Sequence, residues 1–187
     1  MRRLLVLAAL IGMFTPMART QATDLSGDWI LNESKSFLGG DHPRADYQLK
    51  MTLKAEASSV SEMIEAKNAG VAAFGLPKSK SSLELSIDGK EHEIMVPGFM
   101  PGMPPSRLKA SAEWQGTTLV ITQRGMGFGG LTTTTSRLFL TSDQAELIEL
   151  VETHNGFADM QQRRVYDRQQ KSHRSPCMGR PPQLTTP

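Results

Sequence analysis

The stretch Ser26-Gly27-Asp28-Trp29-Ile30-Leu31-Asn32 decides how the rest of the chain is interpreted. Trp29 is one of two tryptophans, and it lies on a short apolar run that ends in a turn-forming asparagine, a pattern typical of a β-strand. An indole ring at the start of a folded domain has to be shielded from water by side chains from elsewhere in the chain. The segment 163–168, Arg-Arg-Val-Tyr-Asp-Arg, predicts a strand at the other end of the chain. We therefore expect the two strands to pair and close the sheet, with Arg164 or Arg168 lying over the Trp29 ring.

The same residues carry a resemblance. Gly27-Asp28-Trp29 is similar to the G-x-W motif that opens lipocalins, which pack an arginine of the last strand across that tryptophan. The start at 25–32 and the ending Val165-Tyr166-Asp167-Arg168 also resemble those of small secreted lipocalin-like proteins of bacteria. The resemblance runs from Leu25 to Arg168 and implies a lipocalin-like (calycin-type) barrel. It implies a fold more than a function.

The pattern of the whole chain is that of an all-β protein. Apolar and polar residues alternate with period two, and turn signals separate the runs. Short connections favour a single antiparallel up-and-down β-barrel of about 8–10 strands. The expected strands cover residues 26–32, 47–54, 60–67, 83–87, 91–96, 108–114, 117–122, 131–141, 146–153 and 157–167.

Three dipeptides predict hairpins between neighbouring strands. Asp88-Gly89, Gln115-Gly116 and Asn155-Gly156 are residue pairs that favour tight turns, so we expect the strands on either side of each to pair. At Met63-Ile64 two apolar residues interrupt the alternation, which allows for a bulge in that strand.

The chain divides into three parts. Residues 1–22 have the layout of a signal peptide, with Arg2-Arg3, an apolar run and small residues up to Ala22, so we expect export across the inner membrane to the periplasm. No transmembrane segment is expected after its removal. The barrel domain is expected at 23–168, and residues 169–187, rich in Pro, Gln and Ser, read as a disordered tail.

Loss of the signal peptide reverses the net charge. It removes three arginines and no acidic residue, so the full-length value of +2 becomes −1, with 18 basic residues against 19 acidic ones. This balance argues against nucleic acid as a partner. Cys177 is the single cysteine, so no intramolecular disulfide can form.

A barrel of this size has either a filled interior or room for one small ligand. Small side chains on an inward face, at Ala110 and Ala112, and apolar loops at the mouth favour a ligand site. The leading hypothesis is a secreted protein that binds a small apolar or amphipathic molecule; the alternative is that the loops plug the barrel. The candidate ligand-binding residues are Met51, Leu85, Ala110, Ala112, Trp114 and Ile121 in the barrel, and Phe99, Met100, Met103 and Phe128 at its mouth.

Two other functions remain open. The exposed Met and Phe loops could dock a protein partner, which the sequence does not identify. A less favoured hypothesis is periplasmic handling of Cu(I), because Met95, Met100 and Met103 lie close together with His92 before them and thioethers bind Cu(I).

The sequence contains no motif that predicts catalysis. The four histidines, His42, His92, His154 and His173, have no metal-binding or catalytic spacing. The glycine-rich segment 125–130 continues into a strand rather than a helix, so it does not resemble a phosphate-binding loop. We therefore predict no catalytic residue, no metal site, no cofactor and no enzyme activity.

Overall fold

The computed structural model describes residues 23–39, 46–67, 80–96, 104–127 and 130–169. Within these ranges the chain is all β apart from one short 3-10 helix, η1, and the expected antiparallel barrel is confirmed. The ten strands are β1 (Gly27–Leu31), β2 (Gln48–Ala55), β3 (Ser59–Lys67), β4 (Ser81–Ser86), β5 (His92–Val96), β6 (Ser106–Gln115), β7 (Thr118–Gly127), β8 (Gly130–Leu140), β9 (Glu146–His154) and β10 (Asp159–Arg168), with η1 at Glu33–Lys35.

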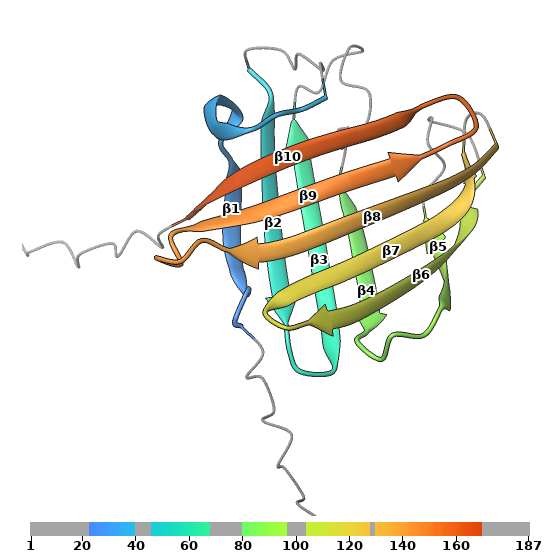
Figure 1. Ribbon diagram of the computed structural model, residues 1–187, viewed down its shortest axis with the longest axis horizontal. Coiled ribbons are helices and arrows are strands. Elements are labelled where there is room, and N and C mark those ends of the chain that lie inside the picture. Colours follow the sequence, from blue (N-terminus) through green and yellow to red (C-terminus); the bar gives the residue numbers. More distant parts are fainter. Residues whose placement is uncertain (1–22, 40–45, 68–79, 97–103, 128–129, 170–187) are drawn as a thin grey trace, which may run out of the picture.

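The strands form one sheet that curves round on itself. Its order is β4-β3-β2-β1-β10-β9-β8-β7-β6-β5, so chain neighbours pair everywhere except between β4 and β5. Figure 1 shows β1–β4 running steeply behind the oblique strands β6–β10. The barrel is therefore nearly closed. We call the paired first and last strands the β1–β10 seam, and the two facing sheet edges the β4–β5 seam.

The β1–β10 seam confirms that the ends of the folded domain pair. Trp29 lies opposite Arg168 and Leu31 opposite Tyr166 in an antiparallel ladder. The pairing extends past the strand, because Asn32 N donates to the carbonyl of Val165 at 2.8 Å. The predicted pairing of the first and last strands is therefore confirmed.

The predicted hairpin at Asp88-Gly89 is wrong. β4 pairs only with β3, and β5 only with β6. The turn itself forms, since Asp88 Oδ1 accepts from Lys90 N at 2.9 Å. However, Gly89 N donates to the Ala112 carbonyl of β6 at 3.0 Å, which directs the chain onto the other sheet edge. A turn dipeptide specifies a local reversal, and the ladder that follows depends on longer-range pairing.

The other local predictions have mixed outcomes. β6 and β7 pair across the turn at Gln115-Gly116, and β9 and β10 pair across Asn155-Gly156, so both hairpins are confirmed. β2 and β3 pair without interruption from Gln48↔Lys67 to Ala55↔Val60. The bulge allowed for at Met63-Ile64 does not occur in this ladder.

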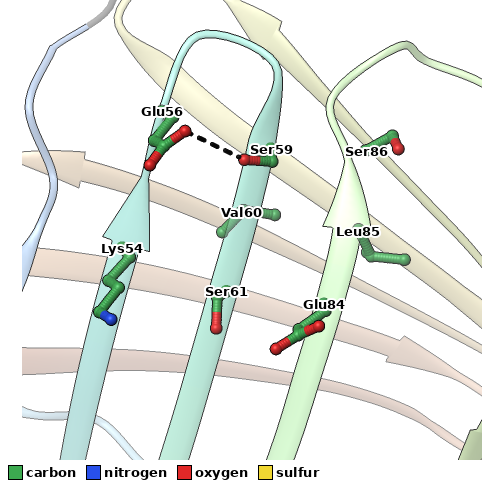
Figure 2. Close-up of a pocket in the computed structure, with 8 residues that line it drawn as sticks. All are labelled: Lys54, Glu56, Ser59, Val60, Ser61, Glu84, Leu85 and Ser86. Atoms are coloured by element: carbon green, nitrogen blue, oxygen red, sulfur yellow. Dashed lines mark hydrogen bonds between the residues drawn. The ribbon is translucent and has the colours of Figure 1, made fainter.

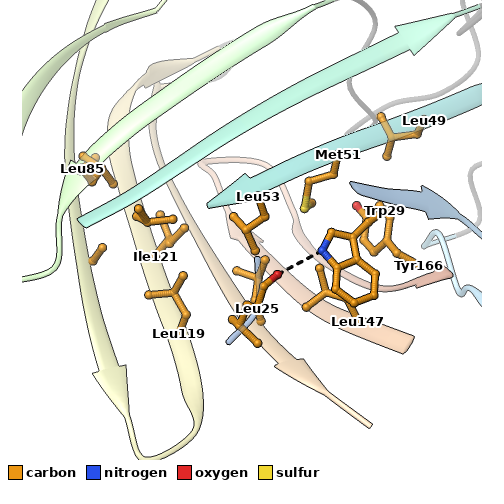
Figure 3. Close-up of a cluster of buried hydrophobic side chains, with 14 of the residues drawn as sticks. Leu25, Trp29, Leu49, Met51, Leu53, Leu85, Leu119, Ile121, Leu147 and Tyr166 are labelled. Carbon is orange, nitrogen blue, oxygen red and sulfur yellow. Dashed lines mark hydrogen bonds between the residues drawn. The ribbon is translucent and has the colours of Figure 1, made fainter. Parts of the chain in front are cut away.

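The barrel packs around the ring of Trp29. Its Nε1 donates to the Leu25 carbonyl at 3.1 Å, which satisfies the buried indole (Figure 3). The core side chains around it come from both halves of the sheet. We define the apolar core as Leu25, Trp29, Leu49, Met51, Leu53, Leu119, Leu138 and Leu147, each at most 1% exposed. In the part of the chain described, no helix has the length and apolarity needed to cross a membrane.

Candidate functional site

A group of polar side chains lies inside the barrel beside the apolar core. We call Ser136, Glu149, Gln162, Arg164 and Tyr166 the polar cluster. Arg164 Nη1 donates to Glu149 Oε2 at 3.2 Å, and its Nε and Nη2 donate to Gln162 Oε1 at 3.1 and 2.6 Å. The Glu149 carboxylate also accepts from Ser136 Oγ at 3.0 Å and Tyr166 Oη at 2.8 Å. A buried ion pair is tolerated when hydrogen bonds surround it in this way.

Burial and the ion pair fix the charge states of this cluster. Burial alone would lower the pKa of Arg164, but the Glu149 carboxylate and the Tyr166 hydroxyl beside it raise that pKa above its usual value. Burial raises the pKa of Tyr166 well above its usual value, and the charge of Glu149 adds to the effect. Arg164 is therefore a permanent cation, and Tyr166 is a permanent hydrogen-bond donor to Glu149.

Glu62 is a second carboxyl inside the barrel. It lies on β3 between Leu53 of β2 and Leu83 of β4, at an inward position of the pleat. Its pKa is raised from 4.5 to about 8, mainly by burial and also by the charge of Glu149, while the charge of Arg164 opposes the rise. Among the described residues, none forms a hydrogen bond or ion pair with Glu62. A half-buried carboxyl with a raised pKa is a frequent mark of a functional site.

A cavity of about 120 Å³ lies against Glu62 at the β4–β5 seam. Both sheet edges contribute to it, because β4 and β5 each supply lining residues. Typical sites for drug-sized ligands measure about 300–1,000 Å³, so this cavity has room for a small molecule or for the head of a larger one. The side chains that line it with Glu62 are Ile64, Ser81, Ser82, Leu83, Val96 and Gln123.

The interior is less completely filled near this seam than near Trp29. Glu62, Ile64 and Leu83 sit at inward positions, yet each keeps partial exposure. At the β1–β10 seam, Trp29 and Tyr166 are completely buried. The molecule therefore combines a packed core with a partly filled region around Glu62.

The predicted barrel residues lie inside, as their alternation indicates, but they pack into the hydrophobic core rather than line the cavity. Met51, Leu85, Ala110, Ala112 and Ile121 are at most 5% exposed and belong to the hydrophobic core. Trp114 is partly buried against the same core. The cavity is lined by other residues. Ligand contact by the six therefore stays a prediction, and Phe99, Met100, Met103 and Phe128 lie outside the described residues.

The two candidate closure arginines have different positions. The Arg168 guanidinium lies 4.5 Å from the centroid of the Trp29 ring, in a cation–π contact. Arg164 turns away from that ring and belongs to the polar cluster. The arginine over the indole is thus the one opposite Trp29 in the β1–β10 ladder.

Sequence reasoning missed Glu62, Glu149 and Gln123 as interior residues. The available signal was a charged residue at an apolar position of the alternation, as in Val60-Ser61-Glu62-Met63-Ile64 and Leu147-Ile148-Glu149. In a strand with one face in solvent, apolar side chains point inward and polar ones point to solvent. A charged residue at an inward position breaks this alternation, and the break predicts that its charge is buried.

Two further hollows lie away from Glu62. One of about 340 Å³, beside the β2–β3 turn, has mostly polar and charged lining; Glu56 and Ser59 are hydrogen-bonded there (Figure 2). The other measures about 460 Å³ and lies over β5–β7. Met126 and Leu131 at its edge are 73% and 66% exposed. The hypothesis of a docked protein partner stays a prediction, with these two side chains as its described apolar surface.

The described histidines have local partners. His92 Nε2 lies 2.9 Å from Asp88 Oδ1, and His154 Nδ1 lies 2.9 Å from Asp159 Oδ1. Within the described ranges, no group of three or more His, Cys, Asp or Glu residues is placed to hold a metal ion. His92 and Met95 alternate to opposite faces of β5, which does not favour a shared Cu(I) site.

Comparisons with solved structures agree on the fold. The chain resembles a secretory abundant heat soluble protein of Ramazzottius varieornatus, with a TM-score of 0.51 and 8% identity over 78% of this chain and 95% of that one. It also resembles apo lipid binding protein 8 of Caenorhabditis elegans, with a TM-score of 0.50 and 9% identity over 77% and 94% of the two chains.

A third similar structure is the zebrafish ileal bile acid-binding protein complexed with cholic acid. Its TM-score is 0.50, at 10% identity over 78% of this chain and 99% of that one. No family model matches the chain, and no curated protein matches it. At these identities the likeness concerns the fold alone, an antiparallel β-barrel that resembles those of the lipocalin-like proteins.

Proposed function

We propose that this protein binds a small amphipathic molecule inside its barrel. The observation that carries the proposal is the cavity at the β4–β5 seam, where an inward carboxyl and partly exposed apolar side chains meet. An interior that served only to stabilise the fold would gain nothing from Glu62, because burying a carboxyl without a partner costs free energy.

The fold supports the same proposal. Two structures of similar fold carry titles that describe a lipid binding protein and a bile acid-binding protein with cholic acid. The proposal includes the export expected from residues 1–22, so that the ligand would be met in the periplasm. The apolar core closes one side of the site, and the two unpaired edges of the β4–β5 seam give the ligand its entry.

A blocking substitution with a matched control tests the site. Ile64 lines the cavity, whereas its neighbour Met63 takes the opposite, outward position on β3. Ile64→Trp should fill the cavity and reduce binding of a fluorescent single-chain amphiphile at least tenfold. Met63→Trp should bind as the unchanged protein does, because the added ring lies outside.

Binding is measured by fluorescence titration of the full chain, with near-ultraviolet circular dichroism to show that each variant is folded. Equal binding by both folded variants would place the amphiphile outside the cavity. Failure of the unchanged protein to bind any of several amphiphiles, anionic, neutral and cationic, would overturn the proposed function itself.

A further inference from the structure

The charged groups inside the barrel do not balance. Arg164 is paired with Glu149 at 3.2 Å, and its remaining contacts include both bonds to Gln162. Glu62 has no such partner among the described residues. When all three are ionised, the interior charges of the described residues are therefore one guanidinium and two carboxylates, and the unmatched charge is that of Glu62.

The neighbours of Glu62 do not supply the missing cation. On β2 and β4 its ladder partners are Leu53 and Leu83, which are apolar. From the other side of the barrel, the charges of Glu149 and Arg164 shift the pKa of Glu62 in opposite directions. The charge of Glu62 in turn raises the pKa of Tyr166. Arg164 is already engaged by Glu149, so among the described residues no cation is left to pair with ionised Glu62.

The rest of the cavity lining fits a cation with an apolar body. Ile64, Leu83 and Val96 provide an apolar wall. Ser81, Ser82 and Gln123 contribute hydroxyl or amide oxygens, which accept hydrogen bonds from N–H groups. The volume of about 120 Å³ limits the bound part to a compact group.

We propose that the cavity binds a compact protonated amine, whose ammonium group pairs with the Glu62 carboxylate while its apolar part lies against Ile64, Leu83 and Val96. This inference rests on the proposed function, because it names the ligand class of the same interior. It also separates this barrel from one that binds carboxylates, since the buried arginine that could hold an anion is committed to Glu149.

Binding would be coupled to proton release. Burial raises the pKa of Glu62 to about 8, so the carboxyl is mostly protonated at neutral pH. An ammonium group favours the ionised form, so protonated Glu62 loses its proton to solvent as the ion pair with the amine forms. Amine affinity should therefore rise up to tenfold per pH unit below about 8 and level off above it, until the amine itself deprotonates near about 10.4.

The test compares three probes with the same tail: hexylamine, 1-hexanol and hexanoate. Binding to the full chain is followed by isothermal titration calorimetry, or by NMR shifts if it is weak. We expect hexylamine to bind at least tenfold more tightly than the other two at pH 7.5. Glu62→Gln should lower hexylamine affinity at least tenfold and abolish its pH dependence. Glu65→Gln, which removes an outward carboxylate of the same strand, should leave it unchanged.

A second measurement does not depend on any variant. Calorimetry in two buffers of different ionisation enthalpy should show release of close to one proton per hexylamine bound at pH 6.5. Tight binding of hexanol or hexanoate without preference for the amine would overturn this inference and leave the ligand-binding function standing. So would amine binding that is insensitive to Glu62→Gln or releases no proton. If none of the three probes nor any larger amphiphile binds, both proposals fail.

Discussion

The two seams of the barrel differ in what lies beneath them. Under the β1–β10 seam, backbone pairing is continuous and the side chains inside, Trp29 and Tyr166, are completely buried. Under the β4–β5 seam, the strand edges are unpaired and the inward side chains Glu62 and Leu83 remain partly exposed. The first seam holds the fold together, and the second leaves room for a ligand. The barrel thus assigns stability and binding to opposite sides of one interior.

The same change made on the two sides should have the largest difference in effect. Leu147 is completely buried beside Trp29, and Leu83 is a partly exposed leucine of the cavity wall. Leu147→Ala should cost about 3 kcal/mol of the free energy of unfolding, because it removes buried surface and leaves a void. Leu83→Ala should cost about 1 kcal/mol or less, since its surroundings already contain space.

Both values come from urea denaturation of the two variants and the unchanged protein, followed by tryptophan fluorescence. The comparison is valid if the unfolding free energy of all three proteins depends equally on urea concentration. Differences in the midpoint then report differences in stability alone. Equal losses at the two positions would mean that the β4–β5 side is packed as tightly as the other.

The pH dependence of stability provides a sharper comparison, because the β4–β5 side holds Glu62, an inward carboxyl without a partner among the described residues. With a pKa of about 8 in the fold against 4.5, Glu62 keeps its proton in the folded state over a range where the unfolded chain has lost it. Its contribution to stability therefore falls as pH rises from about 4.5 to 8, and is constant above that. Discounted for partial exposure, the change is on the order of 2–4 kcal/mol.

Glu62→Gln should remove this contribution. The variant should match the unchanged protein near pH 5 and exceed it by on the order of 2 kcal/mol at pH 8.5. Denaturation at a series of pH values measures the difference curve. Glu65→Gln is again the control, and a flat difference for Glu62→Gln would show that the carboxyl ionises in the fold as freely as in the unfolded chain.

The sequence predicted one seam and not the other, for a physical reason. The pairing of the strands that carry Trp29 and Arg168 could be predicted from sequence. An indole near one end of the chain must be covered by other side chains, and a strand with several arginines lies at the other end. Asp88-Gly89 indicates a reversal but carries no information about the edge to which the next strand pairs. That choice is made by the ladder of β5 with β6, which joins residues far from the turn.

The interior was predictable in part. Alternation correctly placed Met51, Ala110 and Ile121 on the inward face. It could not show that Glu62 and Arg164 face each other across the barrel, because they lie on strands of opposite sheet halves. Their approach depends on the curvature of the whole sheet, and so does the position of the cavity.

The smallest expected effect concerns the contact that led to the fold. Arg168 lies 4.5 Å from the Trp29 ring but is itself exposed, so the cation–π contact is worth only about 0.5–1 kcal/mol. Arg168→Met keeps an apolar stem over the ring and removes the charge, whereas Arg168→Lys keeps the charge and loses the planar group. Denaturation should therefore rank the unchanged protein above both variants by less than any loss at Leu147. A loss of several kcal/mol in either would mean that the guanidinium, rather than the packed core and the strand ladder, closes the β1–β10 seam.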